Sequence, residues 1–298
     1  MKILILMSSY NGERYIKDQI DSILANKRDG LDVALLVRDD GSTDQTIKIL
    51  KEYQRDGCLE YIDGTGNIGP AQSFRWLIDN CPLGYDAYGF ADQDDLWDDK
   101  KLSAAMKSIL GLTQPALWYC AILPFYGQIE DTGKKYVCAL ERAESLRAVI
   151  ETFGTTNGCT MVINEALLNI LRSCGPGRID MHDSWVHAMV LACGGMVRHD
   201  TTPYVFYRIH EAQVLGSGRD GAKARWYRFF HPSRMRVETV KTMLTSNEIL
   251  PRHYRYLEQV RDYRYIKNKV YLLLEKRPAG VTKKEHRDFK IRIFLHLY

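Results

Sequence analysis

Short apolar runs alternate with longer, periodic segments along the first 92 residues. Continuous apolar runs are typical of strands that are buried on both faces of a sheet. The longer segments repeat apolar residues at the spacing of an amphipathic helix. The expected strands are 2–8, 33–37, 59–62 and 88–91, and the expected helices are 15–24, 42–50 and 71–78. This alternation predicts an α/β fold with a mostly parallel central sheet and flanking helices.

The pattern continues less regularly toward the C-terminus. Helices are expected at 101–110, 165–171 and 183–190, and strands at 117–126, 195–197 and 203–209. Beyond these, 266–274 and 289–298 have the pattern of amphipathic helices. We therefore expect a catalytic α/β domain over residues 1–216 and a basic, mainly helical region over residues 217–298.

Charge is distributed unevenly along the 298 residues. The net charge is +4, but residues 217–298 hold 20 Lys and Arg against 8 Asp and Glu, so that residues 1–216 are acidic. A basic helical region with aromatic side chains suits a peripheral membrane contact. The alternative is a helical bundle that packs on the catalytic domain and keeps its basic face solvated. Nucleic acid is not an expected partner, because no recognised binding module accompanies the charge.

The sequence does not predict a membrane-spanning segment or a signal peptide. No apolar run approaches the roughly 18 residues of a membrane span, and the apolar run 3–7 is too short for a signal peptide. The seven cysteines are scattered and form no Cys-x-x-Cys pair. This usage indicates reduced thiols in a cytoplasm and argues against a zinc site.

Three carboxylates, Asp92, Asp94 and Asp95, directly follow the apolar run 88–91. Carboxylates this close repel one another unless water or a cation separates them. Asp92 and Asp94 offer the oxygen ligands that Mg²⁺ or Mn²⁺ prefers, with a diphosphate completing the shell. The alternative is a solvated, acidic helix start.

The polar ends of the other strands support a site. In parallel sheets, ligands bind outside the carboxyl ends of the strands. These ends are Ser8 to Asn11, Asp39 to Asp40 and Asp92 to Asp95. Acidic pairs at two ends of one sheet favour a binding site over ordinary polar loops.

A glycine-rich segment, Gly64 to Gly69, offers a competing function. It spells G-x-G-x-x-G between a strand and a helix, as a nicotinamide-binding loop does. However, it follows the third strand, and no acidic strand end stands about 20 residues later. A flexible turn is the simpler interpretation, and a nicotinamide-dependent oxidoreductase is the alternative function.

Two later segments carry further candidate groups. Asp183 stands near the start of a helix, where the dipole favours its ionised form and suits it to act as a general base. An N-cap aspartate is the commoner use of such a position. Arg208 and His210 close the last expected strand, where either side chain could reach an anion, although a lone histidine is more often structural.

Together these segments resemble the family 2 glycosyltransferases of the GT-A fold, and especially bacterial rhamnosyltransferases of cell-wall and O-antigen polysaccharide synthesis. Eight motifs occur in the family's order over about residues 1–216. They are Met7-Ser8-Ser9-Tyr10-Asn11-Gly12-Glu13, Arg38-Asp39-Asp40-Gly41-Ser42-Thr43-Asp44, Asn67-Ile68-Gly69, Ser73-Phe74, Asp92-Gln93-Asp94-Asp95-Leu96-Trp97, Gly158-Cys159-Thr160, His182-Asp183-Ser184-Trp185 and Tyr207-Arg208-Ile209-His210.

The resemblance implies roles for particular residues. Asp94 is the implied direct metal ligand, and Asp92 faces the ribose or a metal-bound water. Asp183 matches the catalytic base, and Arg208 with His210 lies near the diphosphate. The implied contacts to the nucleotide sugar come from the first strand ends and the glycine-rich segment: Ser9, Tyr10, Asn11, Asp39, Asp40 and Asn67.

The implied reaction is an inverting, metal-dependent transfer from a nucleotide sugar to a saccharide or lipid-linked saccharide acceptor. The implied donor is dTDP-rhamnose, with a UDP-hexose as the alternative, and the cofactor is Mn²⁺ or Mg²⁺. Ser184 and Gln213 depart from the pattern of many relatives, which carry Trp and Asn there, and this weakens the choice of rhamnose. The implied location is the cytoplasm, with a peripheral contact at the inner face of the bacterial cell membrane.

Overall fold

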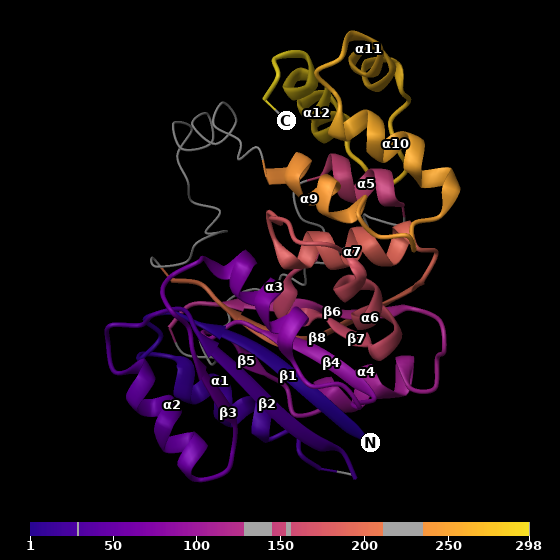
Figure 1. The fold of residues 1–298 in the computed structure, drawn as a ribbon. Coiled ribbons are helices and arrows are strands. Elements are labelled where there is room, and N and C mark those ends of the chain that lie inside the picture. Colours follow the sequence, from indigo (N-terminus) through magenta and orange to yellow (C-terminus); the bar gives the residue numbers. More distant parts are fainter. Residues whose placement is uncertain (29, 128–144, 153–155, 211–234, 298) are drawn as a thin grey trace. The chain divides into compact units, whose positions relative to one another are not determined.

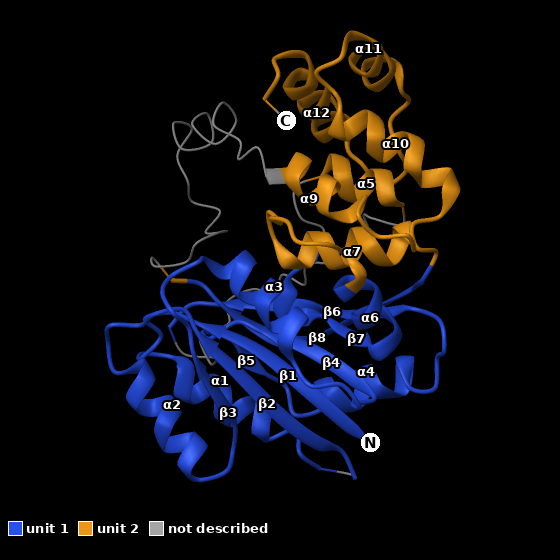
Figure 2. Ribbon diagram, viewed as in Figure 1, with its two compact units in different colours: residues 1–139, 156–172, 195–209 blue, residues 140–155, 173–194, 210–298 orange. Residues whose placement is uncertain are grey.

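A computed structural model describes the chain except for residues 29, 128–144, 153–155, 211–234 and 298. The chain forms two compact units (Figure 2). The sheet unit comprises residues 1–139, 156–172 and 195–209. The helical unit comprises residues 140–155, 173–194 and 210–298. Both units are built from several segments of the chain. The predicted division into domains at residues 216 and 217 therefore stays a prediction.

An eight-stranded sheet forms the centre of the sheet unit, in the order β3-β2-β1-β4-β7-β6-β8-β5 (Figure 1). β1, β2, β3 and β4 run parallel, and so do β6 and β8, whereas β7 runs antiparallel to β4 and β6 and β5 runs antiparallel to β8. The strands are β1 (Lys2–Ser9), β2 (Asp32–Asp39), β3 (Glu60–Asp63), β4 (Ala87–Ala91), β5 (Leu96–Trp97), β6 (Ala116–Phe125), β7 (Val162–Asn164) and β8 (Met196–Arg208).

Helices connect these strands in the alternation that the sequence predicts. They are α1 (Ile16–Leu24), α2 (Thr46–Arg55), α3 (Pro70–Asn80), α4 (Lys101–Ile109) and α6 (Glu165–Ser173), with a short 3₁₀ turn, η2, at Gly158–Thr160. β1 shows why the sheet forms, because its odd-numbered residues Ile3 and Ile5 pack in one core cluster with Ile20 of α1. Leu4 and Leu6, which point to the other face, are buried as well. The predicted α/β, mostly parallel fold is therefore confirmed.

One long strand replaces two predicted strands near the end of the sheet unit. We expect separate strands at 195–197 and 203–209, but β8 is continuous from Met196 to Arg208. Register shifts against β6 at Ala121 absorb the irregular segment, which lets the strand continue through Pro203. A break in the apolar pattern therefore marks a bulge here, and the prediction of two strands is wrong.

The helical unit contains α5 (Leu146–Glu151), α7 (His182–Ala192), α9 (Met235–Met243), α10 (Pro251–Arg261), α11 (Ile266–Leu274) and α12 (Lys283–Phe294). The C-terminal region is thus helical where it is described, and α11 is confirmed. The helix predicted at 289–298 is misplaced, because the Thr282 and Glu285 side chains form a capping box that starts α12 earlier. No helix in the described ranges is long and apolar enough to cross a bilayer.

Candidate active site

The carboxyl ends of β2, β1 and β4 lie next to one another at one edge of the sheet. Ser9 pairs in register with Asp39, and Met7 pairs with Ala91, which directly precedes Asp92. The three polar segments singled out in the sequence therefore meet at one place, as the parallel topology requires.

Asp39 and Asp40 are both buried and hydrogen-bonded within the protein. Asp39 accepts hydrogen bonds from Ser9 Oγ at 2.9 Å and from the backbone N–H of Ser42 at 2.7 Å. Asp40 accepts from Arg38 Nη1 at 2.6 Å and from the backbone N–H of Gly69 at 2.8 Å. These carboxylates fix the two loops that follow β2 and β3. The contacts to a nucleotide sugar implied for Ser9, Asp39 and Asp40 stay predictions.

Of the predicted contact residues at this edge, Tyr10, Asn11 and Asn67 are exposed. The backbone of Tyr10 is held by the Gln93 side chain, whose Oε1 accepts from its N–H at 2.8 Å and whose Nε2 donates to its C=O at 2.9 Å. Gln93 thereby ties the loop after β1 to the loop after β4, a role that sequence spacing does not reveal. Tyr10 is 44% exposed and presents its ring to solvent beside these loops.

Gly64 has a packing reason to be glycine. A side chain there would collide with the backbone oxygen of Asp39 and the guanidinium of Arg38. The segment follows β3, which is the edge strand of the sheet, whereas a dinucleotide-binding loop follows the first strand. Packing thus accounts for Gly64, and Gly66 and Gly69 have φ values of 141° and 81° that favour glycine, so local backbone structure accounts for the pattern.

We expect Arg38→Met to destabilise the protein by about 3 to 5 kcal/mol, because it leaves the Asp40 carboxylate buried without its counter-charge. The Arg38 and Asp40 side chains are 4% and 2% exposed, so water cannot replace the guanidinium. Urea unfolding at neutral pH measures the loss. Arg55→Met, which alters an exposed arginine on α2, serves as the matched control and should change stability by less than about 0.5 kcal/mol.

The acidic loop after β4 contains side chains of different accessibility. Asp92 and Asp94 are partly exposed, whereas Asp95 is fully buried. Burial, with the neighbouring charges of Asp94 and Asp92, raises the pKa of Asp95 well above its usual range. The carboxylates of this loop that a ligand can reach are therefore Asp92 and Asp94.

Arg208, at the end of β8, holds this loop in place. Its Nε donates to the backbone oxygen of Asp94 at 2.9 Å, and its own backbone N–H donates to Asp95 Oδ1 at 3.2 Å. The guanidinium also lies over the rings of Tyr15 and Phe125, at 4.5 and 4.7 Å from their centroids. The arginine thus places a permanent positive charge beside the carboxylates. The predicted contact of Arg208 with a diphosphate stays a prediction.

The ligand chemistry of this loop fits a hard divalent cation. Oxygen atoms of Asp92 and Asp95 and Sγ of Cys159 lie within 4.8 Å of one another. Asp95 Oδ2 is buried and has no hydrogen-bond partner in the described chain. Carboxylate oxygens suit Mg²⁺ or Mn²⁺, whereas burial raises the pKa of the Cys159 thiol and keeps it a poor ligand. A cation that also binds a ligand from solvent needs carboxylates that solvent can reach, which are Asp92 and Asp94. Asp94, the predicted direct metal ligand, is not among the three residues whose ligand atoms lie this close together.

Lys101 is a buried amine beside the acidic loop, and its place in the sequence indicates only the start of a helix. Its Nζ donates to the backbone oxygen of Cys159 at 2.5 Å and lies 3.0 Å from the centroid of the Trp97 ring. Burial lowers its pKa to about 7, while Asp95 and Asp92 act in the opposite direction. Lys101 is a structural support for η2 and the acidic loop, and 58 positions separate it from its hydrogen-bond partner.

Asp183 lies in the helical unit, at the second residue of α7. The N-cap is Met181, so that the alternative of an N-cap aspartate is wrong. Asp183 Oδ1 accepts from the backbone N–H of Ser184 at 2.6 Å. Burial raises the pKa of Asp183 to about 6, helped by the negative charge of Asp180 and opposed by Arg236. A carboxylate with this pKa is ionised at neutral pH and is basic enough to accept a proton.

The residues around Asp183 are held by α9. Asp180 accepts from Thr239 Oγ1 at 2.7 Å, and Arg236 donates to the backbone oxygen of Ile150 at 2.7 Å. His182 is buried, which lowers its pKa to about 3 and keeps it neutral. His210 is also assigned to the helical unit, and its predicted place near a diphosphate stays a prediction.

Comparisons with known proteins identify a matching family model and several relatives of this chain. Residues 4–118 match the family model described as Glycosyl transferase family 2. The dTDP-rhamnosyl transferase RfbG of Shigella flexneri is 27% identical over 222 residues, covering 71% of this chain and 74% of the relative. The putative teichuronic acid biosynthesis glycosyltransferase TuaG of Bacillus subtilis is 28% identical over 109 residues, covering 36% of this chain and 42% of the relative.

Solved structures share the fold at low sequence identity. TarS of S. aureus, crystallised with UDP-GlcNAc, has a TM-score of 0.59 and 16% identity, covering all of this chain and 80% of its own. The mannosyltransferase PcManGT of Pyrobaculum calidifontis, solved with GDP-Man and Mn²⁺, has a TM-score of 0.55 and 17% identity, covering 99% of this chain and 86% of its own. The predicted resemblance and the GT-A fold are confirmed, and the chain carries a glycosyltransferase family 2 domain at residues 4–118.

Proposed function

We propose that the protein is an inverting, metal-dependent rhamnosyltransferase that moves rhamnose from dTDP-rhamnose to a saccharide acceptor. The observation that carries this proposal is the pair of reachable carboxylates, Asp92 and Asp94, at the carboxyl ends of the parallel strands. Arg208 holds their loop, and a buried Asp95 lies behind them. The likeness to the rhamnosyl transferase of Shigella flexneri supports the choice of donor.

The proposed reaction is a single displacement. Asp183 accepts the proton of the acceptor hydroxyl while the hydroxyl oxygen forms a bond to the anomeric carbon. The bond from that carbon to the donor diphosphate breaks, and the diphosphate leaves with the bonding electrons. Attack opposite to the leaving group inverts the configuration, so one base suffices and no covalent sugar–enzyme intermediate forms. A bound Mn²⁺ or Mg²⁺ supplies Lewis-acid stabilisation of the departing diphosphate.

The proposed acceptor is a growing polysaccharide chain of the cell envelope that is attached to a lipid. The relatives from Shigella and Bacillus, by their names a rhamnosyl transferase and a teichuronic acid glycosyltransferase, support this class of product. Such an acceptor requires the enzyme to work at the cytoplasmic face of a membrane, which is the peripheral location that we propose.

A transfer assay with a panel of donors tests the donor assignment. The protein is incubated with dTDP-rhamnose, UDP-glucose, UDP-GlcNAc or GDP-mannose, each with Mn²⁺ and a lipid-linked saccharide extract, and nucleotide release is measured. We expect release from dTDP-rhamnose to exceed the others by at least about tenfold. A UDP-hexose preferred over dTDP-rhamnose would replace the rhamnose assignment and keep the reaction class.

A further inference from the structure

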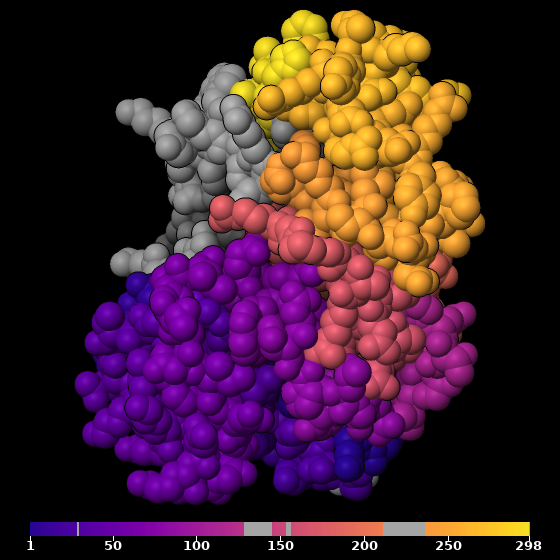
Figure 3. Space-filling model, in the orientation of Figure 1, coloured from indigo at the N-terminus to yellow at the C-terminus, as the bar shows by residue number. Residues whose placement is uncertain are grey.

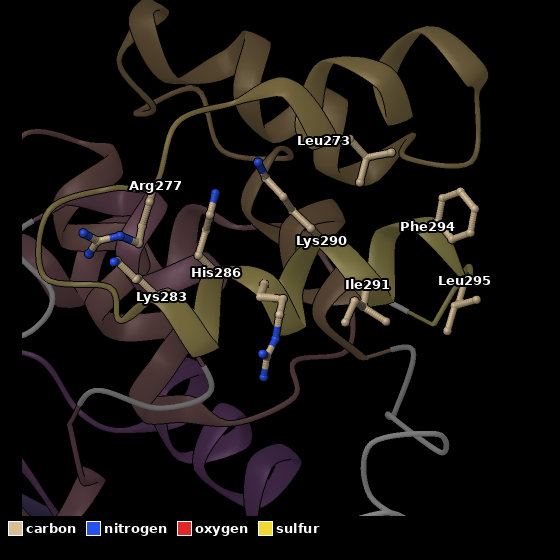
Figure 4. A pocket seen from close by; sticks show the side chains of 9 residues that line it. Leu273, Arg277, Lys283, His286, Lys290, Ile291, Phe294 and Leu295 are labelled. Atoms are coloured by element: carbon tan, nitrogen blue, oxygen red, sulfur yellow. The ribbon is translucent and has the colours of Figure 1, made fainter.

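A groove in the helical unit lies between α11 and α12 and is separate from the acidic loop of the sheet unit. Its volume is about 510 Å³, and apolar atoms form most of its inner surface. We call it the basic groove. It is lined by Leu273, Arg277, Lys283, His286, Arg287, Lys290, Ile291, Phe294 and Leu295 (Figure 4).

The basic groove has two chemically different ends. Arg277 and Lys283 lie together at one end, and Phe294 and Leu295 lie at the other (Figure 4). Lys290 projects from α12 between them. A ligand that fills the groove therefore needs an anionic head and an apolar tail. A free phosphate or a nucleic-acid backbone matches only the first of these ends.

The positive charge of the groove is only partly neutralised, because Arg287 pairs with Asp288 at 3.6 Å and His286 Nδ1 lies 2.6 Å from Oε2 of Glu151, which leaves the lysines. Four of its lining residues are Lys or Arg, and none is Asp or Glu. Within the described residues, Lys283 and Lys290 form no ion pair with a carboxylate. The carboxylate of Glu275, at the end of α11, pairs instead with Arg147 at 2.7 Å. Lys283 also stands in the first turn of α12, where the helix dipole adds positive potential.

Exposed apolar side chains extend beyond the groove. Ile266, Val270 and Leu274 of α11 are 73%, 45% and 78% exposed, and their spacing of four residues places them along one stripe. At the apolar end of the groove, Phe294 is 61% exposed. The surface of these C-terminal helices is seen in gold to yellow in Figure 3. Apolar side chains ringed by lysine and arginine are typical of helices that lie at a membrane surface.

We propose that the basic groove binds an anionic phospholipid of a bilayer. Arg277 and Lys283 hold the headgroup phosphate, and the first part of an acyl chain lies against Phe294 and Leu295. The stripe of Ile266, Val270 and Leu274 then enters the interfacial layer of the same membrane. This rests on the peripheral location proposed above, and it is independent of the sugar donor and of the reaction.

Vesicle flotation of the whole chain tests the proposal. Wild-type protein is expected to float with phosphatidylglycerol vesicles and to stay largely unbound with phosphatidylcholine vesicles. The double variant Lys283→Gln/Lys290→Gln is expected to bind phosphatidylglycerol roughly 30-fold more weakly, given about fivefold per basic residue near an anionic surface. Phe294→Ser is expected to weaken binding about tenfold, because it removes the apolar contact and keeps the charge.

The matched control is Lys48→Gln/Lys51→Gln, which removes the same charge from exposed positions on α2. It should bind as wild type does. The proposal would be overturned if the variant with Lys283 and Lys290 replaced bound phosphatidylglycerol vesicles as well as wild type does. It would also be overturned if the control variant lost as much vesicle binding as that variant. Unchanged binding by Phe294→Ser would also contradict it, since general charge attraction would then suffice. Flotation needs no sugar donor, so its failure leaves the transferase proposal standing and an inactive transferase leaves the flotation result intact.

Discussion

Asp94→Ala is expected to lower the rate of sugar transfer by about a thousandfold, the scale on which removing a preorganised charge contact slows a reaction. The side chain is partly exposed at the carboxyl end of β4, while its backbone oxygen is held by Arg208 Nε at 2.9 Å. The loop should therefore keep its shape when the carboxylate is removed. Initial rates with dTDP-rhamnose and Mn²⁺ measure the loss, and circular dichroism verifies the fold.

Asp99→Asn is the control for this loop. Asp99 follows β5, the next strand after the acidic loop, and it pairs with Arg28 on the surface. Its replacement removes one negative charge near the loop without touching Asp92 or Asp94, and we expect the rate to stay within about twofold of wild type. An Asp94→Ala protein with the wild-type rate would show that the reachable carboxylates of this loop take no part in transfer.

Asp183→Asn is expected to reduce kcat by about a thousandfold and to leave the affinity for the donor nucleotide nearly unchanged. Asparagine preserves the size of the side chain and cannot accept the acceptor's proton. Because burial raises the pKa of Asp183 to about 6, the wild-type rate should fall below about pH 6 as the carboxylate becomes protonated. Single-turnover rates between pH 5 and pH 8 measure this profile, and the residual activity of the variant should lack it.

The raised pKa of Asp183 also predicts that the stability of the protein depends on pH, in the direction opposite to the rate of transfer. The pKa of Asp183 is 3.8 in the unfolded chain and about 6 in the folded protein. Between about pH 4 and about pH 6, the folded state therefore binds more protons than the unfolded state does. The stability of the wild type should therefore fall as the pH rises from about 4 through about 6. Asp183→Asn removes this loss, and at pH 8 we expect it to be more stable by roughly 1 to 2 kcal/mol, since the side chain is only partly buried.

Asp288→Asn, a partly buried position on α12 beside Arg287, provides the comparison. It should change neither the pH profile nor the rate. If Asp183→Asn transfers sugar as fast as wild type, or loses stability at pH 8, then Asp183 is not the raised-pKa base of this reaction.

Sequence periodicity predicted the part of the site that follows from sheet topology. Parallel strands bring their carboxyl ends to one edge, so the sequence alone predicts that Ser9, Asp39 and Asp92 lie near one another. Gln93 is different, because its hydrogen bonds to Tyr10 depend on how two loops curl after their strands end. A pattern of apolar residues carries no information about that curl.

The buried support of the acidic loop could not be predicted either. Lys101 begins α4 and reads as an ordinary charged residue at a helix start, yet it is buried and contacts Cys159 across 58 positions. Such a contact depends on the tertiary packing of η2 against the sheet. The sequence also does not predict that residues 173–194 belong to the same unit as the C-terminal helices, because this depends on contacts between α7 and α9.

The most direct test of the central claim is the melting temperature of the protein with dTDP, measured with Mn²⁺ and again with EDTA. The account predicts that saturating dTDP with Mn²⁺ raises the melting temperature by several degrees, since a ligand at about 100 times its Kd stabilises the native state by about 2.7 kcal/mol. EDTA or the Asp94→Ala substitution should remove most of this shift. No shift with dTDP or UDP under any condition, or a shift with NADH alone that EDTA does not affect, would contradict the account.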